Sequence, residues 1–96
     1  MTQEELLTDL KKIKSDLLHQ FGIKEIVLFG SYARNDFTPE SDVDLAIVNI
    51  EKKDYFIRAK AKYYLEKLLQ KKVDLGYLDT IRPFIRKEIE NEMIHV

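Results

Sequence analysis

The sequence contains no cysteine, and only three glycines and two prolines interrupt it. The lack of cysteine excludes disulfide bonds, thiolate metal sites and a cysteine nucleophile, and it fits a reducing compartment, so we expect a cytoplasmic protein. No apolar run reaches the roughly 18 residues that a membrane-spanning helix needs. The first residues, MTQEELLTDLKK, are acidic and amphipathic, unlike a signal peptide. We therefore expect no membrane association.

An excess of positive charge is also missing. The chain has 16 Lys and Arg against 17 Asp and Glu, which leaves a net charge of −1. Proteins that bind nucleic acid through bulk charge carry a basic excess or patch, so we expect no direct nucleic-acid binding. The length of 96 residues, 45% of them hydrophobic, suits one core, and residues 1–96 are expected to form a single domain.

Periodic apolar positions predict three helices, and apolar runs between turn residues predict three strands. Thr2 and Glu5 have the spacing of a capping box, Gly22 is the expected stop of the first helix, and Asp79 or Thr80 is expected to cap the last one. The expected class is α/β (α+β), with helices on a small mixed three-stranded sheet. The predicted helices cover residues 2–20, 54–71 and 81–92, with a short helix starting at 32–34, and the predicted strands cover 23–29, 43–48 and 73–78.

Connection lengths predict how the strands pair. The first two strands are joined only by residues 30–41, so if they pair directly they run antiparallel. The long helix after the second strand carries the chain back, so the third strand can lie parallel to the second. The end of the first strand and the starts of the other two then lie at one edge of the sheet.

Acidic side chains gather at that predicted edge. Asp42 and Asp44 are two residues apart on an extended chain, so their carboxylates face the same side, and Asp74 starts the third strand. Like charges beside an apolar strand need a counter-charge, which Mg²⁺ bound through oxygen would supply. The ordinary alternatives are a solvated strand end for the first two acids and an ion pair with Lys71 or Lys72 for Asp74.

A second feature at the edge is the turn formed by Gly30 and Ser31, between a buried strand and a helix start. Glycine lets a phosphate approach the backbone, free amides at a helix start favour an anion, and serine adds a hydroxyl donor. The plain alternative is a strand that simply turns there. Together with the acids, the turn has the composition that metal-assisted phosphoryl or nucleotidyl transfer requires.

The stretch GSYARNDFTPESDVDLAIV, followed by Asp74 on a later strand, resembles the DNA polymerase β-type nucleotidyltransferase superfamily. It is especially similar to the minimal nucleotidyltransferases (MNT), many of which are antitoxin partners of HEPN-domain toxins. The resemblance covers nearly the whole chain in element order and implies a polymerase β palm-like fold. One position departs from the pattern Gly-Ser-x-Ala-Arg-Gly, because Asn35 follows Arg34, and asparagine tolerates the left-handed backbone better than most residues.

The resemblance also implies a mechanism. ATP would be the co-substrate, with its terminal phosphates against Gly30 and Ser31. Asp42 and Asp44 would hold two Mg²⁺ ions, and Asp74 would bind one of them beside the attacking hydroxyl and take its proton. The residues implied as both catalytic and metal-binding are therefore the three acids.

Arg34 has two interpretations of equal standing. It could reach the triphosphate as a further nucleotide-binding residue, or it could pair with Asp36 or Glu40 at the surface. His19 and His95 have no partner histidine at metal-ligand spacing, so we interpret both as non-catalytic.

Few residues follow the third predicted strand, so we expect the acceptor to come from another chain. The leading hypothesis is a protein adenylyltransferase that modifies a hydroxyl, such as a tyrosine's, on a HEPN ribonuclease toxin in a hetero-oligomer, as a type VII-like antitoxin. The alternatives are an antitoxin that only masks the toxin and a small-molecule nucleotidyltransferase. A polymerase is disfavoured by the net charge.

Overall fold

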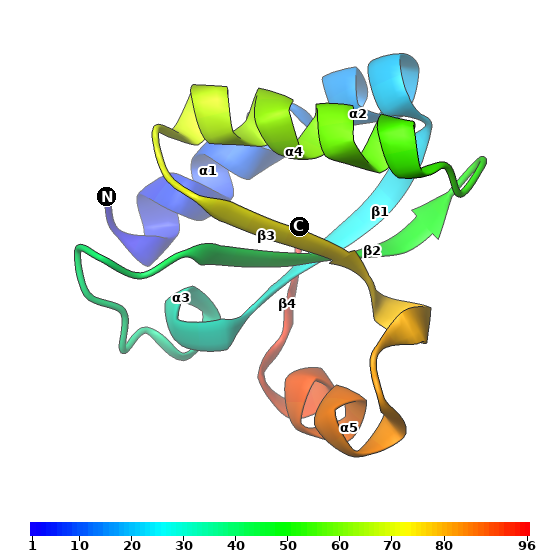
Figure 1. Cartoon of the computed structure of the whole chain (residues 1–96). Helices are drawn as coiled ribbons and strands as arrows, with labels where there is room; N and C mark the ends of the chain where they lie inside the picture. Colours follow the sequence, from blue (N-terminus) through cyan, green and yellow to red (C-terminus); the bar gives the residue numbers. More distant parts are fainter.

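A four-stranded sheet separates two groups of helices in the computed structural model, which describes all 96 residues (Figure 1). In chain order the elements are α1 (Gln3–Lys12), α2 (Lys14–Phe21), β1 (Ile23–Phe29), α3 (Gly30–Arg34), β2 (Val43–Ile50), α4 (Tyr55–Leu69), β3 (Val73–Tyr77), the 3₁₀ turn η1 (Leu78–Thr80), α5 (Pro83–Glu92) and β4 (Ile94–His95). The sheet order is β3-β2-β1-β4.

Strand pairing follows the predicted scheme and adds one strand to it. β1 pairs antiparallel with β2, and β2 pairs parallel with β3, as the connection lengths predict. The prediction of three strands is wrong, because β4 pairs antiparallel with β1, with His95 opposite Val27 and Ile94 opposite Leu28. A two-residue strand is too short to produce a period-two pattern, so the sequence alone does not reveal it.

The first predicted helix is divided in two. Its start is the predicted capping box of Thr2 and Glu5, and its end is Gly22 in the left-handed conformation at φ 68°. Between them Ile13, at φ −103° and ψ 7°, leaves the helical conformation, and its amide turns to the carbonyls of Leu10 and Lys11. No helix in the chain combines the length and the apolar character that crossing a bilayer requires.

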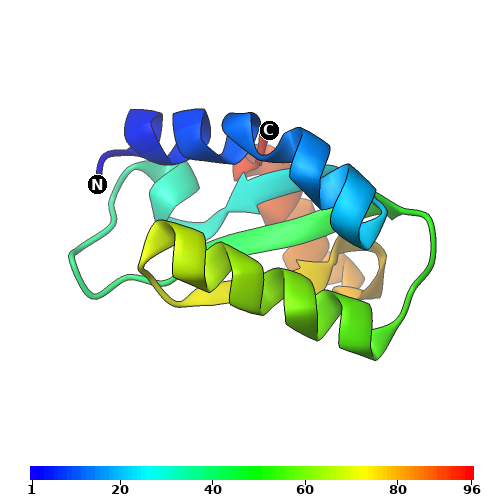
Figure 2. The same ribbon diagram turned by 90° about the horizontal axis from the view of Figure 1, so that it is seen from above.

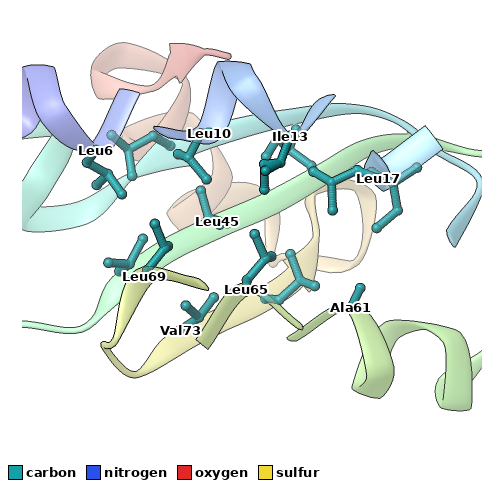
Figure 3. Packing of buried hydrophobic residues seen from close by; sticks show 14 of the residues in the cluster. Leu6, Leu10, Ile13, Leu17, Leu45, Ala61, Leu65, Leu69 and Val73 are labelled. Carbon is teal, nitrogen blue, oxygen red and sulfur yellow. The ribbon is translucent and has the colours of Figure 1, made fainter. Parts of the chain in front are cut away.

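The main core lies between the sheet and the helices α1, α2 and α4, which cover the same face (Figure 2). Leucines of α1 and α2 and of α4 meet the strand side chains there, as Figure 3 shows. Leu6, Leu10, Leu45 and Leu65 are fully buried. The side chains labelled in that view are Leu6, Leu10, Ile13, Leu17, Leu45, Ala61, Leu65, Leu69 and Val73.

The opposite face of the sheet is covered by α5. A smaller cluster of Val27, Ala46, Leu78 and Ile89 attaches that helix to the strands. The helix begins at Pro83 and not at residue 81, because Ile81 and Arg82, both at ψ 138°, are not helical. Its N-cap is Arg82, without the side-chain cap predicted at residues 79–80.

Strand alternation decides which face the acids occupy. Val43 and Leu45 belong to the main core, so Asp44 between them points to the face that carries α5. On the neighbouring strand, Val73 and Leu75 belong to the same core, which turns Asp74 to the α5 face as well.

Candidate active site

Three acidic residues lie at one edge of the sheet. Asp44 pairs with Phe29 at the end of β1 and with Asp74 at the start of β3, so the predicted convergence of the strand ends at one edge is present. Neighbouring strands lie about 4.8 Å apart, so Asp44 and Asp74 are adjacent on the same face. Asp42 precedes Asp44 by two residues, and it is exposed, as is Asp74, whereas Asp44 is partly buried.

Crowding of negative charge is strongest at Asp44. The pKa of Asp44 is raised to about 6, first by burial and then by the nearby carboxylates of Asp74 and Asp42, in that order. The positive charge of Arg34 lowers this pKa, and the carboxylate of Glu92 raises it. Burial and the neighbouring carboxylates together therefore disfavour the ionised form of Asp44.

None of the three acids is neutralised by an ion pair. The lysines considered as partners of Asp74 do not contact it: Lys71 Nζ donates to the carbonyl of Pro39 at 3.2 Å, and Lys72 takes part in no ion pair. The five ion pairs of the structure involve other carboxylates. The salt bridge between Asp74 and Lys71 or Lys72, the ordinary alternative from the sequence, is therefore absent.

The donor set suits a hard divalent cation, although the side chains are not gathered around one. No group of three or more Asp, Glu, His or Cys side chains lies close enough to hold a metal ion as the chain stands. Like charges keep carboxylates apart until a cation offsets their repulsion. Asp42 and Asp74 are exposed, so their side chains can turn towards Asp44 on a backbone that is already in register.

Gly30 is required at its position because of Asp44. Its backbone is left-handed at φ +75°, and a Cβ added there would overlap Oδ2 of Asp44. Only glycine meets both conditions without strain. Its amide is engaged, since Gly30 N–H donates to Oε2 of Glu92 at 3.1 Å. Ser31 follows as the second residue of α3 and is partly exposed.

Arg34 ends α3 and binds two carboxylates. Its Nε donates to Oδ2 of Asp36 at 3.2 Å, one of the two surface partners considered from the sequence, and Glu40 is not a partner. Its Nη1 donates to Oε2 of Glu92 at 2.9 Å. Sequence reasoning missed Glu92. The available signal was its position three residues after Ile89, on the inward stripe of the last helix.

The turn after α3 has the conformation predicted for it. Asn35 is left-handed at φ 64° and ψ 30°, as a glycine at this position of the family pattern would be. Tyr32 is 1% exposed and stacks on Phe37 with ring centroids 4.1 Å apart, which makes it a packing residue. His19 contacts Ser15, and His95 pairs with Glu25, so neither histidine is among the contacts of the acids.

A family model and several named proteins are similar in sequence to this chain. Residues 10–96 match the family of the nucleotidyltransferase domain. A protein of Methanocaldococcus jannaschii is 40% identical over 96 residues, which span 99% of this chain and 98% of that relative. Protein adenylyltransferase MntA of Thermococcus cleftensis is 34% identical over 97 residues, which span 100% of this chain and 97% of MntA.

Solved structures share the fold. A crystal structure of a toxin–antitoxin complex with AMP-PNP has a chain of 26% identity at a TM-score of 0.72, covering 91% of this chain and 70% of that one. A structure of the tri-AMPylated Shewanella oneidensis HEPN toxin with its MNT antitoxin has one of 25% identity at a TM-score of 0.66, covering 98% and 71%. This chain therefore belongs to the nucleotidyltransferase domain family, as a minimal nucleotidyltransferase homologous to the protein adenylyltransferase MntA.

Proposed function

We propose that this chain is a magnesium-dependent antitoxin that transfers AMP from ATP to a hydroxyl group of a HEPN ribonuclease toxin. The observation that carries the proposal is the register of the sheet, which aligns Asp44 with Asp74 and with the end of β1 that leads into Gly30. No cation of the chain pairs with these acids. A site with uncompensated carboxylates beside a glycine-serine turn suits a nucleotide and the cation that accompanies it.

The three acids would hold magnesium. Oxygen donors are the ligands that this ion prefers, and Asp44 carries the crowded charge that a cation relieves. When bound, magnesium supplies the positive charge that stabilises the triphosphate and the developing negative charge of the transition state. The exposed Asp42 and Asp74 would complete the ligand set by turning towards Asp44.

The remaining roles belong to the chain's own groups. Ser31 would donate its hydroxyl to a terminal phosphate, and the missing Cβ of Gly30 leaves room for the carboxylate of Asp44 beside that phosphate. Arg34, already close enough to act on Asp44, would add a further positive contact to the triphosphate. Asp74 is exposed, so an acceptor hydroxyl can reach it and give up its proton there. The hydroxyl oxygen then bonds to the α-phosphorus, and pyrophosphate leaves.

The HEPN toxin is the proposed acceptor because of the relatives. MntA, named as a protein adenylyltransferase, aligns with the full length of this chain. The Shewanella oneidensis complex holds a HEPN toxin that carries three AMP groups beside its MNT antitoxin. AMP attached to a toxin adds negative charge and bulk, which opposes the binding of RNA to the surface of the toxin that carries the AMP. The active complex would be a hetero-oligomer of antitoxin and toxin.

The test is the transfer of label from [α-³²P]ATP, with Mg²⁺, to a purified HEPN-domain toxin. The proposal predicts label on the HEPN protein with the parent chain and none with Asp42→Asn or Asp44→Asn. If the HEPN protein binds this chain and is neutralised without gaining label, the antitoxin acts by masking. Neutralisation of the toxin in cells by Asp42→Asn, at equal expression, would also mean that masking is sufficient.

A further inference from the structure

Glu92 reaches the candidate site from the far end of the chain. It is the last residue of α5, and one of its carboxylate oxygens, Oε2, accepts two hydrogen bonds. The donors are the Gly30 amide at 3.1 Å and Nη1 of Arg34 at 2.9 Å, and they lie 62 and 58 residues away in the sequence. A contact of this range ties the end of the fold to the turn that the proposed function assigns to the nucleotide.

The two donors of Glu92 lie at opposite ends of one short helix. Gly30 is the first residue of α3 and Arg34 is the last, so Oε2 of Glu92 accepts a hydrogen bond from each end of this helix. Gln3 holds the same helix from another side, since its Nε2 donates to the carbonyls of Tyr32 and Ala33 at 2.9 and 3.0 Å. The position of α3 is therefore set by contacts from both ends of the chain.

Burial and charge distinguish Glu92 from the other paired acids. Its side chain is 20% exposed, whereas the side chain of Asp36, the other partner of Arg34, is 60% exposed. Its charge also acts on the pKa of Asp44, which places the carboxylate within electrostatic reach of the proposed metal ligands. Attachment of α5 does not depend on this carboxylate, because Ile89 already packs in the second core.

We infer that Glu92 is a positioning residue, which orients Arg34 towards the triphosphate of the nucleotide and holds the Gly30 backbone in place. Two carboxylates hold the guanidinium through Nε and Nη1, and this fixes its plane before the nucleotide arrives. Because Glu92 already holds the side chain of Arg34 in one rotamer, the guanidinium loses little conformational entropy when it contacts a phosphate. The inference rests on the proposed function, since it assigns a role within that same site.

The test compares Glu92→Ala and Glu92→Gln with the parent chain. The measurements are the dissociation constant of a fluorescent non-hydrolysable ATP analogue with Mg²⁺, and the KM for ATP and kcat of AMP transfer to the HEPN protein. We expect Glu92→Ala to raise the dissociation constant and the KM about tenfold, with a smaller change in kcat. Glu92→Gln keeps an oxygen that accepts both hydrogen bonds, so it should recover part of the loss.

Two comparisons separate positioning from general support of the fold. Glu90, on the same helix, pairs with Arg86 at 3.2 Å and forms no hydrogen bond or ion pair with α3, so Glu90→Ala should leave both constants unchanged. Glu92→Ala introduced beside Arg34→Ala should weaken nucleotide binding at most about twofold further, because its effect passes mainly through Arg34.

Three results would overturn the inference. The first is an unchanged dissociation constant in Glu92→Ala. The second is tighter nucleotide binding in that variant, which would make the carboxylate a competitor of the phosphate. The third is an equal loss of binding in Glu92→Ala whether or not Arg34 is present. If the parent chain itself fails to bind the analogue, the proposed function fails together with the inference.

Discussion

Asp44 and Asp74 lie directly opposite each other in the parallel pair of β2 and β3, and neither is in an ion pair. Their side chains share the face of the sheet that α5 covers, and Asp42 adds a third carboxylate two residues before Asp44. Such an arrangement costs stability when no cation is present, because burial and like charge both oppose ionisation. The stability of the chain without a cation should therefore depend on the charge of these carboxylates.

The first prediction concerns the stability of Asp44→Asn against pH. The folded-state pKa of Asp44, about 6, lies above its ordinary value of 3.8, so the folded chain binds this proton more tightly than the unfolded chain. The stability gained from the protonated carboxyl is complete below about pH 4 and is lost as the pH rises through about 6. One pKa unit corresponds to about 1.4 kcal/mol. Because Asp44 is only partly buried, solvent screening reduces the pH-dependent change in the free energy of unfolding to about 1 kcal/mol.

Asparagine stays neutral, so Asp44→Asn should be the more stable protein by about 1 kcal/mol at about pH 8, with no difference at about pH 4. Urea unfolding in EDTA across this pH range measures the difference. Glu88→Gln, an exposed change on α5 outside any ion pair, is the control. A difference that does not vary with pH would show that Asp44 ionises normally.

The second prediction concerns Gly30→Ala. The new Cβ would overlap Oδ2 of Asp44, and the left-handed backbone costs a non-glycine residue about 1–2 kcal/mol. We expect a lower free energy of unfolding by at least that amount, and AMP transfer reduced about 100-fold by the displaced carboxylate. Gly76→Ala is the matched control, since nothing lies within 4 Å of a Cβ there. Equal behaviour of the two variants would contradict a steric requirement for glycine at residue 30.

The third prediction tests the departure from the family pattern at Asn35. Its φ of 64° is left-handed, so Asn35→Ala should lower the free energy of unfolding by about 1 kcal/mol. Asn35→Gly removes the strain of the left-handed backbone, so this variant should be as stable as the parent or slightly more so. Thermal or urea unfolding of the three proteins provides the measurement. An alanine variant of parental stability would mean that the turn adopts another conformation in solution.

The fourth prediction separates binding from chemistry at Asp74. Asp42 and Asp44, with the Gly30–Ser31 turn, remain in Asp74→Ala, so this variant should still bind an ATP analogue with Mg²⁺. Transfer of AMP should fall by roughly 10²–10⁴, because the acceptor hydroxyl loses the group that takes its proton. Asp79 lies in η1, just beyond the opposite end of β3, and pairs with Lys53, so Asp79→Ala should keep both properties. Parental transfer by Asp74→Ala would assign the proton to another group.

Much of the fold follows from local pattern. β1 has the bounds that its apolar run predicts, and the antiparallel and parallel pairings follow from the lengths of the connections. The features that local pattern does not reveal are β4, which is two residues long, and the break at Ile13, where an uninterrupted apolar stripe continues across a non-helical residue. Both depend on tertiary packing, which overrides the periodic signal.

The candidate site divides in the same way. The shared edge of Asp42, Asp44 and Asp74 could be predicted, because strand order and direction place those positions together. The partners of Glu92 could not be predicted, since its contact with Gly30 spans 62 residues and depends on how α5 docks against the sheet. Its place on the inward stripe of the last helix was the one available signal. Composition offers no help either, because the last helix contains two other glutamates.

The most direct test of the proposed chemistry is the rate of Mg²⁺-dependent AMP transfer to the HEPN protein by the triple variant Asp42→Asn, Asp44→Asn, Asp74→Asn. Asparagine preserves shape and removes the charge that would hold the cation. We predict transfer below detection, with the variant still folded. Transfer at the parental rate would contradict the assignment of these three carboxylates as the centre of the enzyme.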